Sequence, residues 1–274
     1  MKMAREGSKP PGGQDVTTTY TSYRLITQDL TKSLERVSAK SDVKRETDYY
    51  LSKIGSIKSV DDFMADSRLY TYALKAHGLE DMAYAKAFIR KVLTEGIDSK
   101  DDFANKLSDS RYSDLVKSLN FAAQGSAATS FDAAQKGVVD KYNRQTLEQD
   151  AGVENTGVRL ALYFQRQAPG ITSPMAILAD DALSQVVRTV LQIPDEAMGG
   201  DIDKLADHIG KKIDVKDFQD PEKVGKFLER FTALWELSNP SENYDPVSVL
   251  GSGSGYGIST DLLLSINNLK LGGR

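Results

Sequence analysis

Apolar residues recur every three or four positions along almost the whole chain, and long alternating runs of Val, Ile and Thr are missing. This pattern predicts an all-α protein, folded as a multi-helix globular array. A first helix running to about Lys40 is predicted from one apolar stripe: Tyr23, Ile26, Leu30, Leu34 and Val37.

Side chains that cap helices mark several further starts. Ser59 precedes an apolar stripe with Asp62 three residues later, which is an Asp variant of the capping box. Ser173 is followed by Pro174, a pair typical of a helix beginning. The helix predicted after Asp220 contains Trp235, which we expect to be a packed core anchor.

Two parts of the chain resemble each other, which predicts an internal duplication of a helical unit. Segments 57–121 and 171–237 match in two places, first at an offset of 114 and then at offsets of 115 and 116. The helix-prone stretch 131–168, interrupted near Gly152 or Gly157, would join these halves. Because Ser and Asp are common at helix starts, convergent capping is the alternative explanation.

The ends of the chain differ from the middle in composition. We expect residues 1–16 to be a disordered leader and 17–250 to form a single all-helical domain. Residues 251–257 read as a Gly/Ser linker, and 258–274 as a C-terminal helix and tail.

The C-terminal helix carries the candidate interaction surface. Its apolar residues are too numerous for a helix left free in water, so it should dock. It either packs on the chain's own core or inserts into a groove on a partner. The candidate interface residues are Leu262, Leu263, Ile266 and Leu269.

Composition excludes several classes of partner and site. The net charge is -4 and the basic residues are scattered, which argues against nucleic-acid binding. No apolar run approaches the roughly 18 residues that span a bilayer, so membrane insertion is not expected. The absence of cysteine excludes disulfides, thiolate metal sites and cysteine nucleophiles.

No catalytic, cofactor-binding or metal-binding residues are predicted. The only histidines, His77 and His208, both lie near predicted helix ends, where a C-terminal dipole accounts for them, and we expect replacing both to cost little stability. Hallmark motifs of zincins, α/β-hydrolases and P-loop proteins are missing. Paired aspartates sit at predicted helix starts, so capping explains them better than catalysis.

Longer strings resemble a family of alphaproteobacterial proteins known as a domain of unknown function. The resemblance covers nearly everything from residue 17 onward, while residues 1–16 depart from the family's start. It implies an all-helical fold, and because some members are encoded beside flagellar genes it implies a link to flagellar assembly or export. No catalytic residue can be carried over from this family. The strings are SVDDFMADSRLYTYALKAHGLEDMAYAKAFIRKVL (59–93), FANKLSDSRYSDLVKSLNF (103–121), NTGVRLALYFQRQAPGITS (155–173), VKDFQDPEKVGKFLERFTALWEL (215–237) and ISTDLLLSINNLKLGG (258–273).

The sequence therefore predicts a non-enzymatic, monomeric helical protein that acts by binding another protein, with flagellar components as candidate partners. It would be cytoplasmic, or exported to the flagellum without a cleavable signal. The alternative is a helical enzyme or small-molecule-binding domain whose site uses scattered carboxylates and tyrosines. A deep pocket in which a carboxylate meets Tyr or His would favour that alternative.

Overall fold

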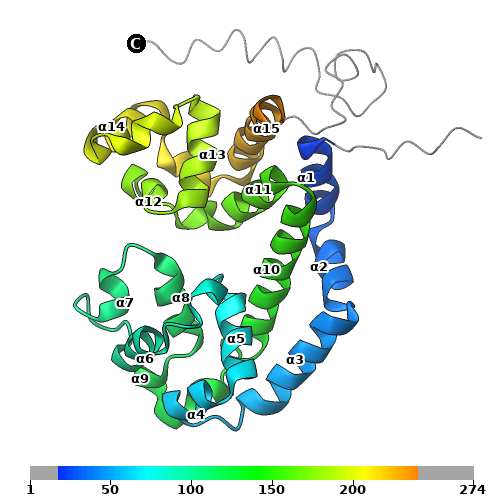
Figure 1. Ribbon diagram of the computed structural model, residues 1–274, viewed down its shortest axis with the longest axis vertical. Coiled ribbons are helices and arrows are strands. Elements are labelled where there is room, and N and C mark those ends of the chain that lie inside the picture. Colours follow the sequence, from blue (N-terminus) through cyan, green and yellow to red (C-terminus); the bar gives the residue numbers. More distant parts are fainter. Residues whose placement is uncertain (1–17, 240–274) are drawn as a thin grey trace, which may run out of the picture.

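The computed structural model describes residues 18–239, which are helical and contain no β-strand. They form two lobes, one above the other in Figure 1, joined along one side by the long helix α10 (Lys136–Glu154). Each lobe buries its own cluster of apolar side chains. The predicted all-α architecture is thus confirmed.

The lower lobe is built from the chain between residues 41 and 154. Its centre is α5, which packs against α3, α4 and α10 and buries both faces of the helix, including Leu69, Ala73 and Leu74. Its elements are α3 (Ser41–Ile54), α4 (Val60–Ala65), α5 (Ser67–Ala76), η1 (Glu80–Met82), α6 (Lys86–Glu95), α7 (Phe103–Lys106), α8 (Ser110–Ser118), α9 (Phe121–Gln124), η2 (Gly125–Ser130) and most of α10.

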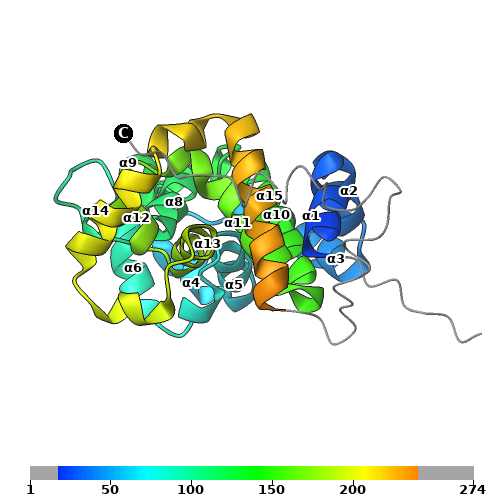
Figure 2. The same ribbon diagram turned by 90° about the horizontal axis from the view of Figure 1, so that it is seen from above.

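The upper lobe is built from residues 156–239. Helix α13 lies at its centre, seen end-on in Figure 2, and packs against α11, α12 and α15. Its elements are α11 (Thr156–Gln167), η3 (Ala168–Gly170), α12 (Pro174–Leu178), α13 (Asp181–Leu191), η4 (Asp195–Gly199), α14 (Ile202–Lys212), η5 (Val215–Gln219) and α15 (Pro221–Ser238).

The N-terminal helices α1 (Thr19–Gln28) and α2 (Leu30–Ser38) connect the two lobes, because α1 packs against α11 and α15 while α2 packs against α10. The sequence pattern predicted one helix here, but the chain breaks at Asp29, whose side chain accepts a hydrogen bond from the N–H of Lys32. Tyr23 then belongs to the upper core and Val37 to the lower core. Because the helix breaks at Asp29, residues of one apolar stripe pack into two different cores.

The predicted interruption within 131–168 is present and falls at Asn155, between α10 and α11. The Asn155 side-chain oxygen accepts hydrogen bonds from the N–H groups of Gly157 and Val158, capping α11. Its amide nitrogen donates to the hydroxyl of Thr19, whose N–H donates to Glu236 at 2.9 Å. The joint between the lobes is therefore tied to the start of α1 and the end of α15.

The two predicted halves fall in different lobes and begin with matching hydrogen bonds. The Ser59 hydroxyl accepts from the N–H of Asp62, and 114 positions later the Ser173 hydroxyl accepts from the N–H of Ala176, both at 3.1 Å. These serines open α4 and α12, the first helix of each half.

A Tyr–Asp pair repeats at the same offset. Tyr49 donates to Asp66 at 2.8 Å, and Tyr163 donates to Asp180 at 2.5 Å. Each aspartate also caps the next helix, α5 or α13, through two backbone N–H groups. These shared contacts agree with the duplication, which stays a prediction because convergent caps give the same bonds.

Candidate functional site

The interface residues predicted from sequence, Leu262, Leu263, Ile266 and Leu269, lie outside the described residues. So do the leader 1–16, the linker 251–257 and the C-terminal segment 258–274. Candidate sites within 18–239 are instead a surface pocket on the upper lobe and a buried polar cluster on the lower lobe.

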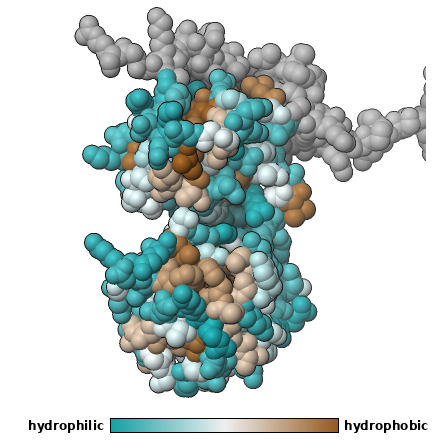
Figure 3. Space-filling view, turned by 60° about the vertical axis from the view of Figure 1, so that its left-hand side comes forward, coloured by the Kyte–Doolittle hydropathy of each residue, from teal (hydrophilic) through white to brown (hydrophobic). Residues whose placement is uncertain are grey.

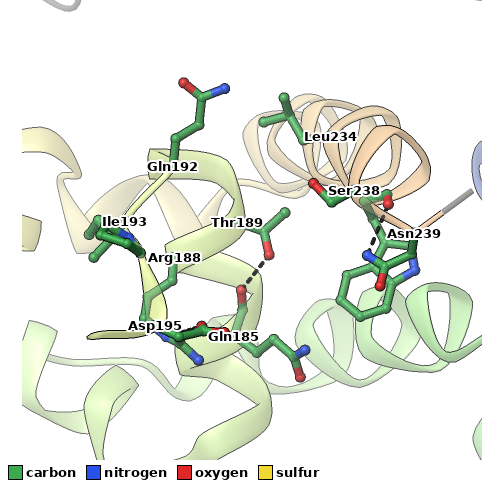
Figure 4. Close-up of a pocket in the computed structure, with 11 residues that line it drawn as sticks. Gln185, Arg188, Thr189, Gln192, Ile193, Asp195, Leu234, Ser238 and Asn239 are labelled. Carbon is green, nitrogen blue, oxygen red and sulfur yellow. Dashed lines mark hydrogen bonds and ion pairs between the residues drawn. The ribbon is translucent and has the colours of Figure 1, made fainter. Parts of the chain in front are cut away.

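The pocket lies between the C-terminal ends of α13 and α15 (Figure 4) and has a volume of about 500 Å³. Helix α13 ends at Gln192, which adopts a left-handed conformation at φ 54°. This conformation is uncommon for a residue with a side chain, and it turns the chain sharply into Ile193 and Pro194. The pocket is lined by Gln185, Arg188, Thr189, Gln192, Ile193, Pro194, Asp195, Leu234, Trp235, Ser238 and Asn239.

Arg188 provides the positive charge of this pocket. Its side chain is only 15% exposed and pairs through Nη1 with Asp195, which is 92% exposed. The Arg188 Nε is buried and has no hydrogen-bond partner among the described residues. The half-buried Trp235 and the buried Leu234 also line the pocket. The pocket thus combines aromatic and aliphatic side chains with the Arg188–Asp195 ion pair.

A second pocket, of about 390 Å³, continues from the first across the turn after α13. The two pockets share Gln192, Ile193 and Pro194, and the second extends to His208 of α14. We call the two together the α13 groove. Its remaining lining residues are Leu191, Ala197, Asp201, Lys204 and Leu205.

The buried polar cluster joins α5, α8 and α10 in the lower lobe. His77 Nδ1 bonds the carbonyl oxygen of Ala73 at 2.8 Å, so Nδ1 is the protonated ring nitrogen. His77 Nε2 then accepts from the Ser118 hydroxyl at 2.9 Å, and Lys141 Nζ donates to Ser118 at 2.8 Å. Burial, reinforced by the nearby Lys141 charge, lowers the pKa of His77 to about 4.

A hydroxyl held by a neutral histidine and a lysine resembles a nucleophile with its base. Here His77 is 8% exposed and Ser118 is 4% exposed, and neither lines either pocket. Burial also lowers the pKa of Lys141. The sequence did not predict this cluster, because its three residues are far apart in the chain. The prediction that His77 lies near a helix end did not include the burial of its ring.

His77 should make stability depend on pH. Its folded pKa of about 4 lies below the unfolded value of about 6.5, so protons bind the unfolded chain preferentially between these values. The free energy of unfolding should therefore fall by up to about 3 kcal/mol as the pH drops from 6.5 to 4. Denaturant unfolding at several pH values measures this loss.

His77→Gln should remove most of this pH dependence while costing about 1–3 kcal/mol at pH 7, because hydrogen bonds in the cluster are lost. Because His77 is buried and hydrogen-bonded, we now expect its replacement to be costly, whereas the sequence alone led us to expect a small cost for both histidines. His208→Gln, at an exposed position on α14, is the matched control and should keep the wild-type profile. Equal pH profiles for wild type and His77→Gln would contradict the assignment.

A buried carboxylate, that of Glu148, links the two lobes. The Glu148 side chain on α10 is 1% exposed and accepts from Arg144 at 2.9 Å and from Arg166 of α11 at 2.7 Å. Arg144 also donates to the carbonyl oxygen of Leu162. These bonds fix α11 against α10.

Within residues 18–239, no group of three or more His, Asp or Glu side chains is arranged to hold a metal ion. None of the helices in this part of the chain is long and apolar enough to cross a membrane.

Comparisons with known proteins identify relatives of this chain. It is similar to a protein from Agrobacterium tumefaciens whose X-ray crystal structure is known, with 65% sequence identity, coverage of 85% of this chain and 99% of that chain, and a TM-score of 0.76. No curated protein matches. A family profile described as "Protein of unknown function (DUF1217)" matches residues 76–224, more than half of the chain. The expected resemblance to an alphaproteobacterial family is confirmed, and the chain belongs to the DUF1217 family.

Proposed function

We propose that this protein works as a monomer by binding another protein, without catalysing a reaction, and that its partners are flagellar components. The flagellar setting rests on the family resemblance. It acts either in the cytoplasm, as an assembly factor, or at the flagellum after export. The observation that carries the binding proposal is the apolar surface beside the hollow between the two lobes (Figure 3).

We call this hollow the interlobe notch; it lies between α11–α12 above and α6–α8 below. Brown and tan residues gather on the part of the lower lobe that borders it (Figure 3). Tyr84, just before α6 of the lower lobe, is 81% exposed. Exposed apolar surface rimmed by polar groups is typical of protein interaction sites. Apolar side chains only partly buried against the lower core include Met82, Ala83, Phe88, Ile97, Phe103 and Leu107.

Polar groups surround this surface. Arg111 of α8 binds the Asp109 carboxylate through Nε at 3.0 Å and Nη2 at 2.8 Å, and donates to the Gly78 carbonyl oxygen at 2.6 Å. It also interacts electrostatically with Tyr163 and Asp180 of the upper lobe. An anchored ion pair together with partly buried apolar residues of the same lobe supports specific recognition of a protein segment.

The enzymatic or small-molecule alternative has less support. It needs a carboxylate and a Tyr or His that converge in a deep pocket. Asp201 and His208 both line the second pocket of the α13 groove, but the Asp201 carboxylate accepts from the N–H groups of Asp203 and Lys204 and so caps α14. Tyr–Asp pairs do form, as Tyr49–Asp66 and Tyr163–Asp180, but each aspartate is engaged in capping a helix. None of these four residues lines either pocket of the α13 groove.

The experiment is affinity capture from motile cells with the tagged full chain as bait. Rod, hook or export components should be recovered with the wild type and lost with Tyr84→Asp, since a charge in the apolar contact must be desolvated. Val153→Asp is the matched control, because Val153 is also apolar and 87% exposed but lies at the end of α10, next to the joint with α11. It should retain the partners. Failure of the wild type to recover flagellar components, or their retention by Tyr84→Asp, would contradict the proposal.

A further inference from the structure

We propose that the α13 groove is a docking site for the apolar C-terminal segment of this same chain, residues 258–271. This inference is independent of the proposed function, because the groove lies on the upper lobe and Tyr84 belongs to the lower one.

The groove leaves part of its apolar lining uncovered. Trp235, which lines the groove, is only half-buried. The buried Arg188 Nε has no partner among the described residues, although unpaired buried donors are costly. The pocket volume of about 500 Å³ is within the range that accepts a ligand of several side chains. The groove therefore leaves apolar surface for an occupant to cover.

The described part of the chain ends at the wall of the groove. Ser238 and Asn239 line the groove, and residues 240–274 continue directly from this wall. Among them, 258–271 contains apolar residues that would be unfavourable in water. They are Ile258, Leu262, Leu263, Leu264, Ile266, Leu269 and Leu271.

The connecting chain is long enough for the C-terminal segment to reach the groove. Residues 240–257 connect the groove wall to this segment, and at about 3.3–3.6 Å per extended residue the connection is far longer than needed. A tethered segment meets its site at an effective concentration near the millimolar range. Even weak burial of leucines in the groove is then enough for occupancy, without any partner molecule.

The chain contains a single tryptophan, Trp235, and it lines the groove, so its fluorescence reports occupancy directly. In the full chain, Leu263→Asp with Ile266→Asp should shift the Trp235 emission to longer wavelength and increase its quenching by acrylamide. Asn267→Asp with Asn268→Asp adds the same charge at polar positions of the same segment. This control should leave emission and quenching as in the wild type.

Addition in trans tests the site itself. A chain ending at Tyr256 keeps every described residue and should show the same red-shifted emission as the double aspartate variant. A synthetic peptide of residues 258–274 contains no Trp or Tyr, so titrating it should restore the wild-type spectrum without adding a signal. Ser238→Arg, at the exposed rim of the groove, should weaken this restoration at least tenfold in peptide concentration.

Identical Trp235 emission in the full chain, the double aspartate variant and the shortened chain would overturn the proposal. So would an emission that varies with protein concentration alongside a doubled mass in light scattering, because a second copy would then be the occupant. The notch variant Tyr84→Asp should not affect the Trp235 signal, so failure of this inference and failure of the proposed function are separate results.

Discussion

Replacing Glu148 with Ala is expected to lower the free energy of unfolding by about 3–5 kcal/mol. The Glu148 carboxylate is 1% exposed and binds Arg144 of its own helix and Arg166 of α11. Its removal leaves the Arg144 guanidinium, 11% exposed, without its carboxylate partner. For a protein of this size the melting temperature should drop by roughly 6–20 °C, measured by calorimetry or circular dichroism.

Two variants separate the ion pairs from a general effect of mutating α10. Glu154→Ala removes an exposed carboxylate from the last turn of the same helix and should change the melting temperature little. Glu148→Gln keeps an oxygen that can accept one hydrogen bond and should fall between the wild type and Glu148→Ala. If Glu148→Ala were no more harmful than Glu154→Ala, the link between the lobes would not depend on this carboxylate.

The helices were predictable because their signals are local. Ser59, Ser173 and Asp220 each cap the helix that the sequence assigned to them. Local patterns report that a side chain is buried but not what it is buried against. Tyr23 and Val37 continue one stripe, yet they enter different cores, so the break at Asp29 and the two lobes were missed.

The candidate site could be predicted even less, because it depends on contacts between distant residues. Trp235 was expected to be a packed anchor, and it does contact Phe231 and Gly157, but one face lines the α13 groove. Arg188 gave no local signal of a pocket, since its role follows from the turn at Gln192 and the end of α15. The predicted interface around Leu263 lies outside the described residues and stays a prediction.

Gly157 shows how such a long-range contact restricts the sequence. A Cβ atom placed on Gly157 would lie 2.5 Å from Nε1 of Trp235 and closer still to Cδ1. Contacts below 3.0 Å are not tolerated, and the crowded atoms belong to a rigid indole ring rather than to the end of a flexible chain. The ring can therefore approach α11 only because residue 157 has no side chain.

Gly157→Ala is accordingly expected to displace Trp235 and to destabilise the upper lobe. Overpacking usually costs about 1–3 kcal/mol, and losing a large aromatic contact costs about 3–5 kcal/mol. We expect the loss in the free energy of unfolding to exceed the first range and to approach the second. Gly225→Ala is the control: it lies in α15 with Trp235 but has nothing within 4 Å, and it should stabilise the helix by up to about 1 kcal/mol. Denaturant unfolding followed by the fluorescence of Trp235 measures both effects at once. Opposite signs for these two Gly→Ala changes are the expected result, whereas an unchanged Trp235 spectrum with wild-type stability in Gly157→Ala would show that the indole does not lie on α11.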